Sequence, residues 1–212
     1  MRNALAAFSL LLALAPALPA AAAFDAASEA RYQRLLTAAK AGDPAIDWGA
    51  LRMAYSNSAE FDLTGSRTDD TRTAMFQALN AGDYKTALAQ ADKIIGEDYV
   101  DIDAHVVSDL ADQQLGDAAA AKTQHEIVLG LLRSVRTGDG STPAKAFTAI
   151  SVGEEYAVMR AFAMKVTSQA LIQSAGHSYD QLNVTDSDGK PQSFYFLIDR
   201  IIAAEGAEMP AH

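Results

Sequence analysis

The chain has 212 residues, a formal net charge of −10 and no cysteine, and half of its residues are hydrophobic. This length allows one domain with a sizeable core, and the absence of cysteine excludes disulfides, a thiol nucleophile and a cysteine-based metal site. An acidic chain without a stripe of Lys and Arg is repelled by phosphate backbones, which argues against a nucleic-acid partner.

The first 23 residues have the three parts of a secretory signal peptide. A basic start at 1–3 precedes an apolar run at 4–18, and small residues follow up to Ala23. The run is short for a membrane span and is interrupted by Pro16, so we expect cleavage before Phe24 rather than a membrane anchor. We therefore expect an exported protein, in a bacterial periplasm or outside the cell, with no membrane anchor after cleavage.

Helical patterns fill the next part of the chain. Apolar residues recur at spacings of three and four, and Gly, Asp and Pro mark the ends of the segments. The expected helices are 24–41, about 47–57 with Asp47 as its N-cap, 68–81, 84–95, 101–115 and 117–135. The segment 58–67 is rich in turn residues and is expected to be a connector.

Two turns within this helical part repeat one another. Gly82-Asp83 and Gly116-Asp117 are 34 residues apart, which is the period of a tetratricopeptide helix pair, and Ala87 and Ala121 keep the same register. One helix pair cannot bury its apolar face alone, so repeated pairs stack. We expect tetratricopeptide-like hairpins here, with two unrelated helical hairpins as the alternative.

After residue 136 the pattern becomes extended. A tight loop at 137–143 is followed by a β-prone run at 147–152 and a short helix at 153–162. Strand patterns follow at 166–175, 178–185 and 194–198, with a hairpin turn at 186–190.

These patterns together predict an α+β fold. The expected organisation is a signal peptide at 1–23, tetratricopeptide-like helical hairpins at 24–136, a small antiparallel β-rich unit at 137–205 packed on the helices, and a flexible tail at 206–212.

Short motifs in a fixed order give the chain a resemblance to a known family. They lie at 51–58, 101–105, His125, 130–134, 138–140 and 150–156. Through them the chain resembles a bacterial family of uncharacterised exported proteins, described as a domain of unknown function, over nearly all of the chain after the signal peptide. The family has no established activity, so the resemblance supports the architecture and implies no role for any residue.

His105 and His125 are the sharpest candidates for chemistry. They stand 11 residues before and 9 residues after Gly116, so at about 1.5 Å rise per residue they lie at nearly the same height in the hairpin. With Glu155 they could perform acid–base catalysis, and with Asp103 they could hold a divalent metal ion. No cofactor is predicted beyond that one possibility. In tetratricopeptide register both histidines occupy packing positions, so we favour a structural role.

We expect a periplasmic or secreted helical-repeat module that binds a protein or peptide partner, because repeat stacks present extended concave surfaces. The acidic charge favours a basic or neutral partner. The alternative is a metal-assisted or acid–base hydrolase with a site around His105, His125 and Glu155. We favour the module, which is not an enzyme, and no feature of the sequence predicts an oligomeric state.

Overall fold

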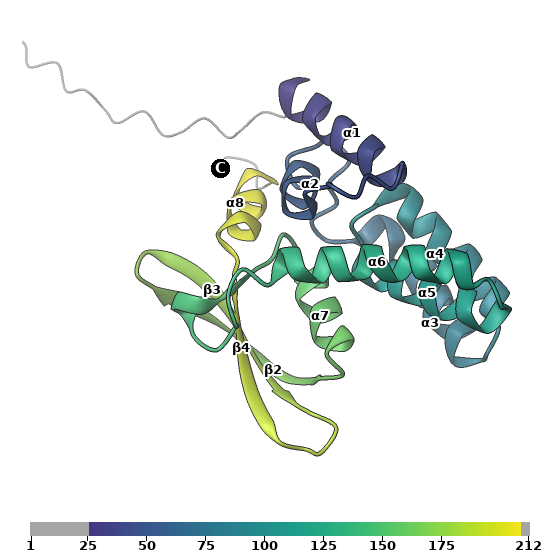
Figure 1. The fold of residues 1–212 in the computed structure, drawn as a ribbon. Coiled ribbons are helices and arrows are strands. Elements are labelled where there is room, and N and C mark those ends of the chain that lie inside the picture. The colour runs from purple at the N-terminus through teal and green to yellow at the C-terminus, as the bar shows by residue number, and fades with distance from the viewer. Residues whose placement is uncertain (1–25, 209–212) are drawn as a thin grey trace, which may run out of the picture.

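The computed structural model describes residues 26–208, so the predicted signal peptide and residues 209–212 lie outside the described part (Figure 1). Its first elements are α1 (Ala26–Lys40), α2 (Trp48–Tyr55), the 3-10 helix η1 (Ser66–Thr68), α3 (Asp69–Asn80), α4 (Tyr84–Glu97), α5 (Ile102–Leu115) and α6 (Ala118–Val135). The later elements are η2 (Pro143–Lys145), β1 (Phe147–Thr148), α7 (Val152–Ala161), β2 (Lys165–Ser174), β3 (His177–Thr185), β4 (Pro191–Leu197) and α8 (Asp199–Glu208). The predicted α+β class, with helices first and a small sheet last, is confirmed.

The hairpins α3–α4 and α5–α6 close through the two repeated turns. Gly82 has φ +73° and Gly116 has φ +87°, the left-handed conformation that glycine adopts most readily at a helix end. The next residue caps the following helix in both cases. Asp83 accepts a hydrogen bond from the Thr86 N–H at 3.1 Å, and Asp117 accepts one from the Ala120 N–H at 3.0 Å. Both hairpins therefore use the same local chemistry.

Helix α2 begins where the sequence predicted, because the Asp47 carboxylate accepts a hydrogen bond from the Ala50 N–H at 2.9 Å. The indole of Trp48, the first residue of α2, lies directly against Gly130 of α6. A Cβ atom on Gly130 would lie 2.2 Å from Trp48 Nε1, so the two helices approach this closely only because Gly130 has no side chain.

The sheet is mixed, which corrects the predicted antiparallel unit. Its strand order is β1-β4-β3-β2. β2–β3 and β3–β4 pair antiparallel, whereas β1 pairs parallel with β4. A parallel pair needs a long crossover connection, and α7, β2 and β3 supply it between β1 and β4. The predicted turn at 186–190 is present, since Asp186 accepts hydrogen bonds from the N–H groups of Asp188 and Lys190.

Helix α8 was not predicted, and it continues to Glu208 where the sequence had indicated a flexible tail from residue 206. The Asp199 carboxylate at its start accepts a hydrogen bond from the Ser178 N–H of β3 at 2.7 Å. Ile198 and Ile201 are buried, so the helix is held against the sheet by apolar contact as well. The short apolar face of α8 was too brief to stand out as a helical pattern.

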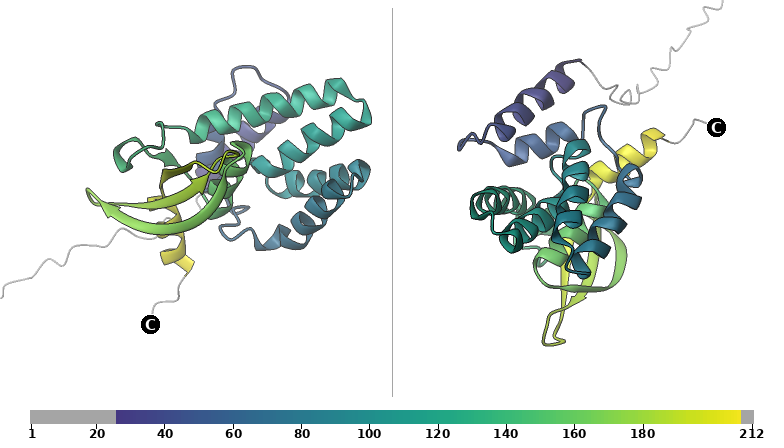
Figure 2. Two further views of the ribbon diagram at one scale, coloured as in Figure 1. Left: turned by 90° about the horizontal axis from the view of Figure 1, so that it is seen from below. Right: turned by 90° about the vertical axis from the view of Figure 1, so that its right-hand side faces the viewer.

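One continuous core joins the helices to the sheet. Its buried residues come from α1, α2, α6, α7, the sheet and the start of α8, and Figure 2 shows the sheet set against these helices. A second, smaller cluster fills the space between α3, α4 and α5. The predicted units 24–136 and 137–205 therefore share a core.

A buried ion pair lies at the joint between these parts. Arg52 of α2 is 1 % exposed and Glu154 of α7 is 7 % exposed. Arg52 Nε and Nη2 each lie 2.6 Å from one carboxylate oxygen of Glu154. Arg52 also donates to the Thr148 carbonyl at 2.9 Å and to Ser134 Oγ at 3.2 Å. The pair thus connects α2, α6, β1 and α7 at one point.

We predict that Gly130→Ala destabilises the protein by about 1–3 kcal/mol, because the new methyl group overlaps the Trp48 indole. The fluorescence of Trp48, the single tryptophan, reports both the local change and denaturant unfolding. Gly96→Ala in α4 is the matched control, since no atom lies within 4 Å of its Cβ position. We expect it to leave stability unchanged or raise it by up to about 1 kcal/mol. Equal effects of the two substitutions would contradict the packing argument.

We predict that Glu154→Gln lowers the free energy of unfolding by about 3–5 kcal/mol, because it leaves the Arg52 guanidinium buried without a countercharge. Chemical denaturation followed by Trp48 fluorescence measures the loss. The control is Glu126→Gln, which breaks the exposed contact of Glu126 with Lys122 at 3.8 Å and should change stability by less than about 0.5 kcal/mol. A loss at residue 154 as small as the control's would show that the pair is dispensable.

Candidate functional site

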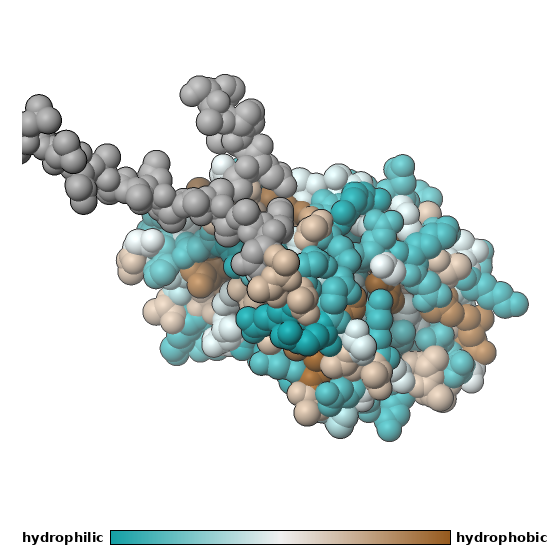
Figure 3. All heavy atoms as spheres, turned by 90° about the horizontal axis from the view of Figure 1, so that it is seen from above, coloured by the Kyte–Doolittle hydropathy of each residue, from teal (hydrophilic) through white to brown (hydrophobic). Residues whose placement is uncertain are grey.

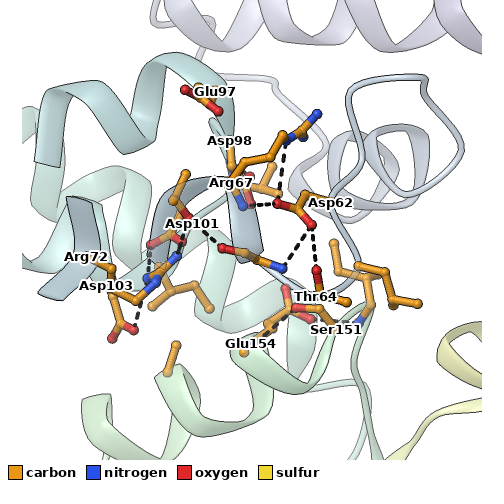
Figure 4. A pocket seen from close by; sticks show the side chains of 18 of the residues that line it. Asp62, Thr64, Arg67, Arg72, Glu97, Asp98, Asp101, Asp103, Ser151 and Glu154 are labelled. Atoms are coloured by element: carbon orange, nitrogen blue, oxygen red, sulfur yellow. Dashed lines mark hydrogen bonds and ion pairs between the residues drawn. The ribbon is translucent and has the colours of Figure 1, made fainter. Parts of the chain in front are cut away.

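A pocket of about 210 Å³ lies where the connector after α2, the start of α3, the α4–α5 junction and the start of α7 meet (Figure 4). A second hollow of about 470 Å³ lies on the sheet, but no charged side chain of residues 26–208 lines it. On the face shown in Figure 3, hydrophobic residues are scattered among hydrophilic ones. The exposed large hydrophobic residues in the described part are spread over α5, α7, β2 and α8. The pocket is therefore the feature from which we build a candidate site.

The connector forms one wall because Asp62 folds it into a compact turn. The Asp62 carboxylate accepts hydrogen bonds from the Gly65 N–H at 3.0 Å and the Arg67 N–H at 2.8 Å. It also accepts one from the Thr64 hydroxyl at 3.1 Å, and Gly65 has φ +70°. Burial alone would raise the pKa of Asp62, but these hydrogen bonds and the Arg67 charge outweigh burial and lower it. Asp62 is thus an ionised structural residue.

A chain of ion pairs ties α3, α5 and α7 together across the pocket floor. Arg72 of α3 lies 2.5 Å from Asp101 and 3.5 Å from Asp103. Arg160 of α7 donates from Nε to Asp103 at 3.0 Å and also from Nη2 to the same carboxylate. Asp101 in addition caps α5 by accepting from the Ala104 N–H at 2.8 Å. These groups hold one another and fix the pocket's shape (Figure 4).

Asp98, the C-cap of α4, is the least compensated carboxyl group of the pocket. It accepts one hydrogen bond of ordinary geometry, from the Val100 N–H at 2.9 Å, and the Tyr55 hydroxyl lies near enough to favour its ionised form. It forms no ion pair within the part of the chain that the structure describes. Burial, followed by the nearby charge of Asp101, raises the pKa of Asp98 well above its usual range. A carboxyl group in this state at a pocket wall is a candidate for ligand binding or proton transfer.

The Tyr55 hydroxyl stands beside this carboxyl group. Tyr55 is 1 % exposed, and its ring packs between those of Tyr32 and Phe61, with ring centroids 5.5 and 5.4 Å away. The hydroxyl is close enough to Asp98 to influence its pKa. It has no hydrogen-bond partner of ordinary geometry among residues 26–208. The hydroxyl lies near Asp98 and the Asp62 N–H without the geometry of a full hydrogen bond to either. Because incomplete hydrogen bonding of a buried hydroxyl costs stability, Tyr55 is a second incompletely bonded group at the pocket.

His105 occupies a packing position, as favoured from the sequence. It is 1 % exposed, and its ring meets that of Tyr99 edge to face with centroids 5.3 Å apart. Nε2 lies 2.9 Å from the Tyr99 carbonyl oxygen, and Nδ1 lies 2.6 Å from the side-chain amide of Gln124. Burial lowers the pKa of His105, which favours a neutral ring with the proton on Nε2.

The other sequence candidates have partners of their own and form no hydrogen bond or ion pair with His105 in the described residues. His125 is exposed and its Nδ1 lies 3.0 Å from Asp109, whereas Asp103 is held by Arg72 and Arg160. The equal height of the two histidines along the hairpin does not make them share a site. Among residues 26–208, no group of three or more His, Asp or Glu side chains is arranged to hold a metal ion.

Glu155, the remaining catalytic candidate, faces the sheet. It is fully buried in α7, and its carboxyl oxygens receive no hydrogen bond from any donor in the described residues. Burial, then the neighbouring Asp180 of β3, raises the pKa of Glu155 to about 9. The group is thus protonated at neutral pH and can donate to Asp180, away from both histidines.

Among the pocket residues, the sequence had indicated Asp103 as a possible metal ligand, whereas Asp98 and Tyr55 were missed. A signal was present, because the segment 97–103 places Glu97, Asp98, Asp101 and Asp103 within seven residues. Local sequence gives no indication that Tyr55 and the connector come to lie against this segment, since those contacts span about forty residues.

The comparison with protein families gives one match. The family model described as "Domain of unknown function (DUF4919)" matches residues 21–206. No curated protein and no solved structure matches the chain.

We predict a pH dependence of stability that comes from Glu155. Its pKa is about 9 when folded and near 4.5 when unfolded. Between these values the folded state therefore keeps a proton that the unfolded state has released. Stability consequently falls as pH rises from about 4.5 to about 9, by at most about 1.4 kcal/mol per pH unit from this group.

Glu155→Gln removes this contribution and keeps a donor for Asp180. The variant should gain stability over the wild type progressively from pH 5 to 9, measured by denaturant unfolding at each pH. The exposed Glu126→Gln serves as the control and should run parallel to the wild type. If the stability of Glu155→Gln also runs parallel to that of the wild type across this pH range, the raised pKa of Glu155 is contradicted.

Proposed function

The chain belongs to the DUF4919 family, and we propose that it is an exported module that binds a protein or peptide partner through the pocket between α3, α5 and α7. The observation that carries this proposal is the pair of uncompensated groups at the pocket, the Asp98 carboxyl group and the Tyr55 hydroxyl. Buried polar groups are normally hydrogen-bonded, and the exceptions need an explanation. A ligand that contacts both groups is such an explanation.

The helical architecture supports a binding role. We propose that α3–α4 and α5–α6 are two tetratricopeptide-like repeats, because their Gly-Asp turns stand 34 residues apart and share the same capping hydrogen bonds. In stacked repeats the concave surface is the usual place of ligand contact. Arg72 of α3 and Asp103 of α5, the first helices of the two hairpins, both line the pocket.

The size of the pocket limits what it can take. Pockets for drug-sized molecules and cofactors measure roughly 300–1,000 Å³, whereas this pocket measures about 210 Å³. The volume favours one side chain or chain end of a larger partner. This supports a partner protein or peptide over a nucleotide-sized cofactor.

We propose export to a bacterial periplasm or to the cell exterior on the basis of the signal-peptide pattern at 1–23. Within the described residues, no helix combines the length and the apolar character needed to cross a membrane. The hydrolase alternative receives no support at its expected place, because His105, His125 and Glu155 have separate partners.

The test of the proposed function starts from an unbiased displayed peptide library selected against the protein without its signal peptide. Peptides that bind are synthesised and their affinities measured by calorimetry. We predict that Tyr55→Phe weakens the selected peptides by about 5- to 30-fold, the loss of one buried hydrogen bond of about 1–2 kcal/mol. The same substitution should leave the free protein as stable or more stable, since none of residues 26–208 forms a hydrogen bond of ordinary geometry with the hydroxyl.

Tyr195→Phe on β4, outside the pocket lining, is the matched control and should leave affinity unchanged. Two results would contradict the proposal. The first is that no peptide can be selected. The second is that every selected peptide binds Tyr55→Phe as tightly as the wild type.

A further inference from the structure

The charges that line the pocket are strongly unbalanced. Its lining contains three arginines, Arg67, Arg72 and Arg160, and seven acids: Asp62, Asp69, Glu97, Asp98, Asp101, Asp103 and Glu154. Each of the three arginines already contacts a carboxylate, because Arg67 meets Asp62, Arg72 meets Asp101 and Asp103, and Arg160 meets Asp103. None of these cations is therefore available to an incoming anion.

Three of the acids have no basic partner in the described part of the chain, namely Asp69, Glu97 and Asp98. Asp69 and Glu97 are exposed, whereas Asp98 is partly buried and Asp101 stands nearby. Figure 4 shows Glu97 and Asp98 on the same side of the pocket. Asp69 and Glu97 therefore give the pocket opening an excess of negative charge. Burial raises the pKa of Asp98 to about 8, and a cation bound beside it favours its ionised form.

The helix ends at the pocket do not reverse this sign. Helices α5 and α7 both begin here, and a helix N-terminus carries a partial positive charge. Each is matched by an acid in its own first turn, Asp103 in α5 and Glu154 in α7. The helix dipoles are compensated within the protein, and Asp98 is not.

The Tyr55 hydroxyl supplies an independent indication of a ligand. It is buried at the pocket wall beside Asp98, and none of residues 26–208 forms a hydrogen bond of ordinary geometry with it. An ammonium or guanidinium group carries several N–H donors in one place. It can donate to Asp98, whose ionised form it favours, and to the Tyr55 hydroxyl oxygen together, whereas a carboxylate or phosphate would meet repulsion from Asp69 and Glu97 at the opening.

We infer that the pocket takes the positively charged end of a lysine or arginine side chain from the partner. This inference rests on the proposed function and specifies its ligand. The cation contacts Asp98 and Tyr55, and Asp69 and Glu97 attract it to the opening. A free polyamine has the same chemistry, so the test must separate it from a peptide side chain.

The experiment uses the tightest peptide from the displayed library. Each arginine of this peptide is replaced by citrulline and each lysine by norleucine, one at a time, which removes charge and preserves most of the shape. We expect one replacement to weaken binding to the wild-type protein at least about tenfold. We expect the unmodified peptide to lose a similar factor against Asp98→Asn.

Asp98→Asn keeps an oxygen that can accept from the Val100 N–H, so the junction should fold, and Trp48 fluorescence checks its stability. Asp188→Asn, in the β3–β4 turn, removes the same charge outside the pocket lining and should leave the affinity unchanged. Spermidine is titrated in parallel as the free cation.

Each of the following three outcomes would overturn one part of the proposal. If the neutral replacements bind as tightly as the original peptide, the cation assignment is wrong and the binding module stands. If spermidine binds as tightly as the peptide and is equally sensitive to Asp98→Asn, the ligand is a free amine and not a partner side chain. If the library yields no binder, the proposed function itself is wrong.

Discussion

The buried contact between Arg52 and Glu154 is the interaction on which the joint between helices and sheet depends. Removing two charges from water is favourable only when the pair is close and its remaining donors and acceptors are satisfied. Here the Thr148 carbonyl, Ser134 Oγ and the Ile150 N–H complete the set. Because these groups come from different elements, α7 can dock on α2 and α6 in one register only. The register of α7 in turn sets the pocket wall that contains Glu154 and Arg160.

Some buried carboxyl groups of the protein are paired with an arginine, whereas Asp98, within the described residues, is not. The chain has 17 Lys and Arg against 27 Asp and Glu, so cations are scarce. They are used where elements meet, at Arg52, Arg72 and Arg160. Asp98 receives none, although it lies at a junction of elements too, and the Tyr55 hydroxyl next to it has no hydrogen bond of ordinary geometry within residues 26–208. Incompletely bonded buried groups cost stability, and two of them at one pocket are the basis for the proposed cation site.

The sequence predicted the parts of the fold that depend on local signals. The helix ends at Asp47, Gly82 and Gly116 follow from caps within a few residues, and the strands follow from alternation. The parallel pairing of β1 with β4 and the burial of α8 depend on contacts distant in sequence and were missed. The same limit applies to the site. Spacing along a hairpin fixes the height of a side chain but not the direction in which it points, so His105 and His125 were predicted level and still have separate partners.

The hydrogen bond of His105 nevertheless relates the predicted histidine to the observed pocket. Its Nε2 holds the carbonyl oxygen of Tyr99, and Tyr99 stands between Asp98 and Val100, which both line the pocket. The neutral, buried ring therefore fixes the backbone of the α4–α5 junction next to Asp98. The structural histidine and the carboxyl group proposed to bind the ligand are in this way parts of one arrangement. His105, the candidate chosen from the sequence, positions the backbone beside the pocket, and the groups proposed to contact the ligand are Asp98 and Tyr55.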